Sequence, residues 1–156
     1  MSSRQDTPPI TMARAGELSA GQLHGLLRLR VAVFIVEQDC PYPELDGWDL
    51  AAGTEHLWIG DAEADEVRAT VRILARGEAR IIGRVATAES YRGSGYAGAL
   101  MDRAVAHLGD REVTLEAQAR LETWYGQWGF VRAGADYLED GIAHVPMRRP
   151  GSLGQA

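Results

Sequence analysis

A glycine-rich hexapeptide is the segment of this chain whose residue types are best suited to chemistry. It follows a strand-like run that ends at Thr87, it precedes an amphipathic helix, and it reads Arg92-Gly93-Ser94-Gly95-Tyr96-Ala97. The first N–H groups of a helix have no partner within the helix, and the helix dipole places partial positive charge at that end. The two glycines let a ligand approach the backbone closely, and Arg92 adds a positive charge. The segment therefore predicts a cradle for a phosphate group.

The pattern around these glycines narrows the choice of phosphate ligand. No Lys-Ser or Lys-Thr pair follows the glycines, as a Walker loop requires, and the third glycine of the dinucleotide fingerprint is missing. The form Arg-x-x-Gly-x-Ala after a strand resembles the pyrophosphate loop of the GNAT superfamily of acyl-CoA N-acetyltransferases. An ordinary Gly-rich turn before a helix is the alternative interpretation.

Three further segments carry the same resemblance. Residues 124–130, Trp-Tyr-Gly-Gln-Trp-Gly-Phe, resemble the second signature of the superfamily, in which a helical Tyr is followed closely by Gly-Phe. Residues 33–46 and 139–144 resemble the ElaA-like branch. The resemblance covers residues 10–149, and it implies a single domain with the GNAT fold of the α/β (α+β) class, a mostly antiparallel sheet flanked by helices.

The resemblance also implies an activity: transfer of an acetyl group from acetyl-CoA, as cosubstrate, to a primary amine of a small molecule or peptide. The mechanism we expect is direct attack by the amine in a ternary complex. Backbone groups of residues 92–97 would hold the pyrophosphate, and those of Val85 and Thr87 would hold the pantetheine arm and polarise the thioester carbonyl. Gln118 stands where the family usually has an Asn that contacts the pantetheine. A non-catalytic acyl-CoA-binding regulatory module is the alternative function.

Tyr125 is the candidate general acid for the departing thiolate, because its phenol can donate a proton at neutral pH. The alternative is a packed aromatic, since Tyr125 recurs with Leu121, Trp124 and Trp128 at helical spacing. Retention of this Tyr favours an enzyme over a binding module.

Glu116 is the candidate general base, because alternation along residues 113–117 places Thr114 and Glu116 on the face opposite Val113 and its partners. His56 and His144 are minor candidates, because imidazole titrates near neutral pH. Ordered water replaces a dedicated base in many members of the superfamily.

An acidic loop after the first helix is the candidate acceptor-binding segment. It contains Glu37, Glu44, Asp46 and Asp49, and such carboxylates would attract a cationic amine. A solvated acidic surface is the alternative interpretation for each of them. We take Glu37, Asp46 and His144 as the predicted acceptor-binding residues.

The single cysteine, Cys40, raises an acyl-cysteine mechanism as a rival, but no histidine lies beside it in the sequence to activate it. The four histidines and one cysteine show no metal-ligand spacing, so no metal is expected.

Composition sets outer limits on these hypotheses. The net charge of −6 disfavours general nucleic-acid binding, and no apolar run is long enough to span a membrane. The N-terminus lacks the apolar core of a signal peptide, so a cytoplasmic protein is expected. Flexible segments are expected at residues 1–9 and 150–156, and the sequence leaves homodimerisation through terminal strands open.

The pattern of apolar residues predicts the elements that must position these groups. Ser19 and Gln22 form a capping box for the first helix, and residues 67–73 alternate as in a half-buried strand. Strands are expected at 10–13, 56–60, 67–73, 80–87, 113–117, 130–133 and 143–147, and helices at 19–34, 97–108 and 121–128.

Overall fold

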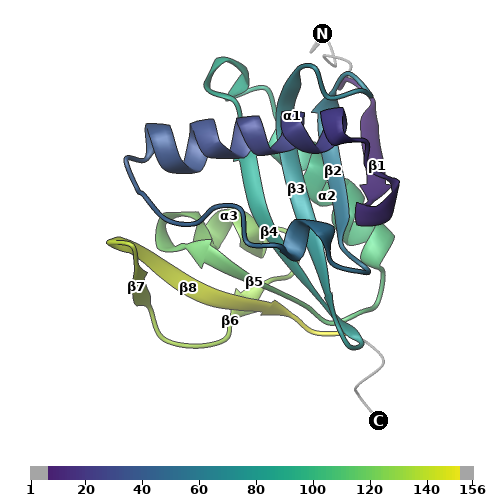
Figure 1. The fold of residues 1–156 in the computed structure, drawn as a ribbon. Coiled ribbons are helices and arrows are strands. Elements are labelled where there is room, and N and C mark those ends of the chain that lie inside the picture. Colours follow the sequence, from purple (N-terminus) through teal and green to yellow (C-terminus); the bar gives the residue numbers. More distant parts are fainter. Residues whose placement is uncertain (1–6, 152–156) are drawn as a thin grey trace, which may run out of the picture.

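A twisted sheet of eight strands runs through the middle of the structure and separates two groups of helices (Figure 1). The structure is a computed structural model and describes residues 7–151, so most of the two predicted flexible termini lies outside the described residues. The strands are β1 (Ile10–Arg14), β2 (Glu55–Gly60), β3 (Val67–Arg76), β4 (Ala79–Thr87), β5 (Val113–Gln118), β6 (Val131–Arg132), β7 (Tyr137–Glu139) and β8 (Ile142–Arg149). The helices are α1 (Ala20–Arg30), α2 (Tyr96–Leu108) and α3 (Glu122–Gly126).

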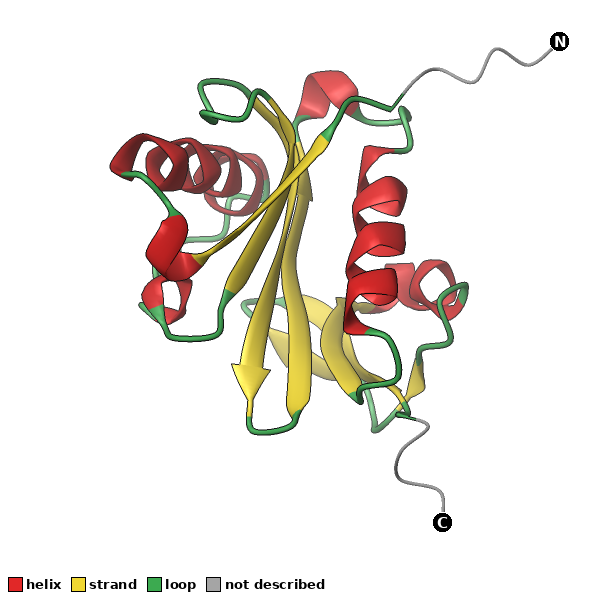
Figure 2. Ribbon diagram, turned by 90° about the vertical axis from the view of Figure 1, so that its right-hand side faces the viewer, coloured by secondary structure: helices red, strands yellow, loops and turns green. Residues whose placement is uncertain are grey.

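The helices cover opposite faces of the sheet. Figure 2 shows the sheet nearly edge-on, with α1 on one side and α2 and α3 on the other. The larger core cluster joins α2 and α3 to the sheet, whereas the smaller cluster joins α1 to the opposite face around Trp58. None of the helices within residues 7–151 has the length and apolarity needed to cross a bilayer.

Helix α1 starts at the predicted capping box. The Ser19 side chain accepts a hydrogen bond from the Gln22 backbone N–H (3.0 Å), and the Gln22 side chain accepts one from the Ser19 N–H (2.9 Å). The helix then continues as a π-helical segment, Val31–Glu37, so the helical region ends three residues beyond the predicted end at Phe34. A π-helix is rare and frequently marks a functional site.

Helix α2 presents the predicted apolar face to the sheet, with four of its side chains buried: Leu100, Met101, Ala104 and Leu108. Its N-cap is Gly95, which has a φ of +80° and no side chain to cap the helix. The first N–H groups of α2 therefore remain available to a ligand.

The sheet follows the order β1-β2-β3-β4-β5-β8-β6, with β7 paired to β8. Its pairs are antiparallel except for β4 and β5, which confirms the predicted mostly antiparallel sheet. These two parallel strands pair only at Arg80 with Val113 and at Ile81 with Thr114, and beyond that point they diverge. The divergence opens the sheet in its middle.

Two details differ from the sequence prediction. The helix expected over 121–128 is a short 3-10 turn, Ala119–Leu121, followed by α3, and strand β7 is an element that was not predicted. In addition, β4 contains a bulge where the pairing with β3 shifts register between Thr70 and Arg72. Arg84 lies at this bulge with a φ of +50°, a conformation that costs energy for any residue with a Cβ.

Candidate functional site

A cavity of about 670 Å³ occupies the opening between β4 and β5. Its wall includes Phe34 and Tyr42 from the α1 side and Ala97 and Tyr125 from the α2 side. The cavity is therefore lined from both faces of the sheet, and a ligand lying in it could meet groups from either face.

The glycine-rich loop lies at the α2 side of this cavity, and two of its six residues, Arg92 and Ala97, line the wall. Gly93 and Gly95 have φ values of +82° and +80°, and a Cβ added at either would meet no protein atom within 4 Å. The space over both glycines is thus open toward the surface, as the predicted phosphate cradle requires. Ser94 is exposed and Tyr96 is half-buried beside Arg68.

The free edge of β4 supplies a second row of backbone donors. The Ala88 N–H donates to the Arg68 carbonyl oxygen (2.8 Å), so alternate N–H groups from Ala88 backward point toward β3. The N–H groups of Val85 and Thr87 therefore point to the other edge, where β5 has moved away. Both residues line the cavity.

Tyr125 projects from α3 and is 7% exposed. Its ring packs edge-on against Phe130, with ring centroids 6.4 Å apart, yet the residue also lines the cavity. Burial raises the pKa of the Tyr125 phenol to about 12, although nearby Arg120 acts in the opposite direction. The phenol is consequently protonated throughout the physiological pH range. Tyr125 is thus a packed aromatic that also lines the cavity, and its role as general acid stays a prediction.

Glu116 and Gln118 line the cavity from β5, on the face of the sheet opposite Tyr125. The predicted alternation holds, since Leu115 and Ala117 are buried in the α2-side core while Glu116 is exposed. Glu116 accepts a hydrogen bond from the Tyr137 hydroxyl (2.6 Å). Gln118 accepts two from the Arg120 guanidinium (3.2 and 3.0 Å).

His144 lies on β8, directly opposite Gln118 on β5 and Tyr137 on β7. Its ring stacks on that of Tyr137, with centroids 5.7 Å apart and planes inclined by 25°. Nδ1 lies 2.8 Å from the Ile142 carbonyl oxygen. His144 thus lines the cavity in a defined orientation, on the same side as Glu116.

Comparison with known proteins identifies this architecture. The acetyltransferase (GNAT) domain family matches residues 31–150. The chain belongs to the GNAT family.

Individual relatives place it more closely within that family. A UPF0039 protein of Mycobacterium tuberculosis is 49% identical over 150 residues, which cover 94% of this chain and 96% of that protein. Protein ElaA of Escherichia coli is 42% identical over 142 residues, covering 85% of this chain and 90% of ElaA. The predicted ElaA-like resemblance is confirmed.

Solved structures agree with the sequence relatives. An acyl-CoA N-acyltransferase from Pseudomonas aeruginosa superposes with a TM-score of 0.84 at 40% identity, covering 90% of this chain and 98% of that one. The crystal structure of Escherichia coli ElaA superposes with a TM-score of 0.83 at 39% identity, covering 90% and 99%. The GNAT fold predicted from the sequence is therefore confirmed.

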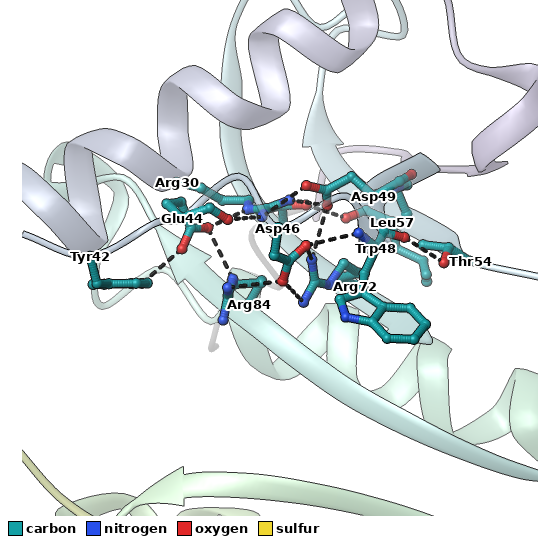
Figure 3. Close-up of polar contacts among 12 residues, drawn as sticks. Arg30, Tyr42, Glu44, Asp46, Trp48, Asp49, Thr54, Leu57, Arg72 and Arg84 are labelled. Atoms are coloured by element: carbon teal, nitrogen blue, oxygen red, sulfur yellow. Dashed lines mark hydrogen bonds and ion pairs between the residues drawn. The ribbon is translucent and has the colours of Figure 1, made fainter. Parts of the chain in front are cut away.

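The acidic loop of this GNAT protein is organised differently from the expectation. Three of its carboxylates, Glu44, Asp46 and Asp49, form ion pairs with arginines (Figure 3), and we call them the inner carboxylates. Arg30, which is 1% exposed, contacts Glu44 at 2.7 Å and Asp49 at 2.5 Å. The loop therefore folds inward between α1 and the sheet instead of forming an open acidic surface.

Two more arginines complete this network. Arg72 reaches Asp46 (3.0 Å) and Asp49 (3.1 Å), and Arg84 reaches Glu44 (3.0 Å) and Asp46 (3.2 Å). Burial alone would raise the pKa of Asp46, but the bonds and charge of Arg72 outweigh it and hold that pKa below its ordinary value. Asp46 is not part of the cavity wall, so the structure does not bring it to the predicted acceptor position.

Of the two remaining candidates, Glu37 lines the cavity and His56 belongs to the buried ion-pair network. Glu37 lines the cavity, but its carboxylate pairs with Arg92 at 2.7 Å. His56 is buried, with Nε2 3.1 Å from the Asp49 carbonyl oxygen, and burial lowers its pKa. It belongs to the structural network and does not line the cavity.

Cys40 is buried and lines the cavity, but its thiol has the wrong electrostatics for a nucleophile. Burial raises the pKa of this thiol, and the neighbouring carboxylates of Asp140, Asp39 and Glu139 raise it further. The Cys40 thiol donates a weak bond to the Asp140 carbonyl oxygen at 3.7 Å. This environment keeps the sulfur protonated at neutral pH and argues against an acyl-cysteine intermediate.

Two cavity residues at the β7–β8 hairpin, and Tyr137 beside them, were given no role in the sequence prediction. Glu139 and Asp140 line the cavity, and Tyr137 anchors Glu116 at its edge. We call Glu116, Glu139 and Asp140 the cavity carboxylates. Among the described residues, no arginine lies within ion-pair distance of any of the three.

Proposed function

We propose that this protein transfers an acetyl group from acetyl-CoA to a primary amine, by direct attack of the amine on the thioester. The observation that carries the proposal is the opening between β4 and β5. It joins an anion cradle, a free row of backbone donors and a protonated Tyr in one cavity. A thioester threaded through such an opening would present its carbonyl carbon to the opposite face of the sheet.

The chain's own groups fit the donor. The N–H groups at the start of α2 and the positive charge of Arg92 would hold the pyrophosphate. The N–H groups of Val85 and Thr87 would bind the pantetheine arm and stabilise the negative charge that develops on the carbonyl oxygen. Gln118 would contact the arm from β5. Tyr125 would protonate the departing thiolate, and because its pKa is high the phenolate would regain a proton at once.

The cradle can be tested with two matched glycine variants. Gly95 has a φ of +80° and Gly77 a φ of +58°, and a Cβ at either position meets no atom within 4 Å. Gly95→Val and Gly77→Val therefore impose a similar backbone strain, but only Gly95→Val fills the cradle. We expect Gly95→Val to weaken acetyl-CoA binding in calorimetry at least tenfold, whereas Gly77→Val should bind as the parent does. Equal affinities for the two variants would refute the placement of the pyrophosphate.

Transfer can be separated from binding with Tyr125→Phe. This variant should keep its acetyl-CoA affinity and lose turnover by about 10²–10⁴-fold, the usual contribution of a general acid. Turnover is measured as thiol release from acetyl-CoA with 1,4-diaminobutane and with a tetra-alanine peptide as acceptors. Tight binding of acetyl-CoA without thiol release by the parent would instead support a regulatory acyl-CoA-binding module.

A further inference from the structure

We propose that His144 is the base that removes a proton from the acceptor amine, and that Tyr137 is the positioning residue for His144 and Glu116. The proposal rests on the function proposed above, and it assigns a step for which the sequence favoured Glu116. It stands on the hydrogen bond at Nδ1, on the stacking of two rings, and on the side of the cavity from which His144 projects.

The hydrogen bond at Nδ1 fixes which nitrogen can act. Nδ1 of His144 lies 2.8 Å from the Ile142 carbonyl oxygen, and a carbonyl oxygen can only accept. Nδ1 therefore carries the proton, and in the neutral ring Nε2 keeps its lone pair. Within residues 7–151, Nε2 of His144 has no hydrogen-bond partner. The unprotonated nitrogen is thus free to accept a proton from a ligand in the cavity.

Tyr137 joins the two groups that could handle this proton. Its ring stacks on His144 (5.7 Å between centroids), and its hydroxyl donates to the Glu116 carboxylate (2.6 Å). Burial and this bond to Glu116 raise the pKa of Tyr137, so its hydroxyl remains a donor. Glu116 consequently has one oxygen engaged by Tyr137, and its negative charge is placed to attract an ammonium group next to His144.

The register of the sheet explains why these residues meet. His144 pairs with Gln118 of β5 on one side and with Tyr137 of β7 on the other. Directly paired residues share a face of the sheet, so the three side chains form one row across β5, β8 and β7. Tyr125 lies on the other face. A thioester in the opening between β4 and β5 would therefore have its acid on one side and its base on the other.

The protons of the reaction balance with these two groups. The acceptor enters as R–NH3+ and gives one proton to Nε2 of His144, which later passes it to solvent. The neutral amine forms the C–N bond at the thioester carbonyl, and the C–S bond breaks. Tyr125 protonates the sulfur and regains a proton from solvent, while the second proton lost by the nitrogen also leaves through Nε2 of His144. The products are the amide, free CoA and one proton in solution.

The test uses two acceptors that differ in how much they need a base. A primary alkylamine such as 1,4-diaminobutane resembles the lysine side chain, with an ordinary pKa near 10.4, whereas the α-amine of a peptide titrates near 7.7–8.0. At pH 8 a large fraction of tetra-alanine is already neutral. His144→Ala should therefore lower kcat/KM by about 10²–10⁴-fold for 1,4-diaminobutane and by at least tenfold less for tetra-alanine.

Added imidazole provides an independent readout. It should restore part of the activity of His144→Ala toward 1,4-diaminobutane in proportion to its concentration, and it should not accelerate the parent. The matched control is His107→Gln, because His107 lies on α2, pairs with Glu55 and is outside the cavity wall. His107→Gln should behave as the parent with both acceptors, with and without imidazole.

The two roles of Tyr137 separate by substitution. Tyr137→Phe keeps the ring against His144 and loses only the bond to Glu116, so it should raise the KM for 1,4-diaminobutane and keep most of kcat, whereas Tyr137→Ala should show a loss in kcat/KM that again depends on the basicity of the acceptor. Acetyl-CoA affinity and the urea midpoint of each variant show that the fold is intact.

Each outcome bears on one proposal. Unchanged turnover in His144→Ala, or an equal loss for both acceptors without rescue by imidazole, would overturn the role of His144 and leave acetyl transfer standing. Absence of thiol release by the parent with both acceptors would overturn acetyl transfer and, with it, this assignment.

Discussion

Two groups of carboxylates in this protein have the same chemistry and opposite surroundings. The inner carboxylates, Glu44, Asp46 and Asp49, come from one loop and are matched by three arginines (Figure 3). The cavity carboxylates, Glu116, Glu139 and Asp140, come from β5 and the β7–β8 hairpin and have no arginine partner among the described residues. Each inner carboxylate is therefore paired with an arginine, whereas the cavity carboxylates are not.

The difference shows that the number of acidic residues in a segment says little about what the segment attracts. A buried carboxylate must be paired, because an isolated charge away from water is very costly. The three carboxylates that look like an acceptor site in the sequence are for this reason the ones that hold the loop against α1 and β3. The carboxylates left to act on a ligand are those that remain at the cavity surface.

Among the substitutions that test this comparison, replacement of Arg30 should have the largest effect, a loss of folding stability. Arg30→Met preserves much of the side-chain volume but leaves Glu44 and Asp49 buried with fewer partners. Breaking a buried ion pair on one side typically costs about 3–5 kcal/mol, so we expect a loss of that order in the free energy of unfolding. Urea denaturation measures it. Arg132→Ala, which removes pairs at the exposed surface, is the control and should change the midpoint little.

A smaller effect concerns the stability of the fold in acid. Burial alone would raise the pKa of Asp49, but bonds to Arg30 and Arg72 outweigh it and hold the pKa below its ordinary value. A group whose folded pKa is depressed contributes stability that is present above its unfolded pKa, near 3.9, and that is lost as the pH falls through the folded pKa. Asp49→Asn should therefore be less stable than the parent at pH 7 and lose less stability between pH 4 and pH 2. If the free energy of unfolding fell in parallel for both proteins, Asp49 would carry no such linkage. The control is Glu139→Gln, whose stability should follow that of the parent at every pH.

The comparison also explains what could be predicted from the sequence. The α2 side of the cavity depends on backbone: two glycines with positive φ, the start of a helix, and an amphipathic repeat. Each of these leaves a local pattern in the sequence, so the glycine-rich turn, α2 and the strands around it could be predicted with small errors in their bounds. The divergence of β4 and β5 leaves no such pattern in the sequence.

The side predicted to bind the acceptor depends on side chains from segments that are far apart in the chain. Which arginine pairs with Asp46 is decided by the packing of β3, β4 and the loop, and no local spacing shows it. One signal was nevertheless present. Asp140-Gly141 between alternating residues is typical of a tight hairpin, and both residues have positive φ values, +50° and +77°. If this pair is interpreted as a two-residue turn, it predicts strand β7 and places Tyr137 opposite His144.

The smallest effect is expected at the cavity carboxylates themselves. Glu139 is exposed, so its attraction for a cation is screened by water, where two charges 4 Å apart interact by about 1 kcal/mol. We expect Glu139→Gln to raise the KM for 1,4-diaminobutane about two- to fivefold, with kcat and the KM for acetyl-CoA unchanged, because only binding of the acceptor is weakened. The difference in KM should shrink in 0.5 M salt, since at about 1 M ionic strength the Debye length is only about 3 Å.

The matched control is Glu63→Gln, because Glu63 is an exposed acid outside the cavity wall. If Asp46→Asn raised the acceptor KM while Glu139→Gln left it unchanged, the roles of the inner and cavity carboxylates would have to be exchanged.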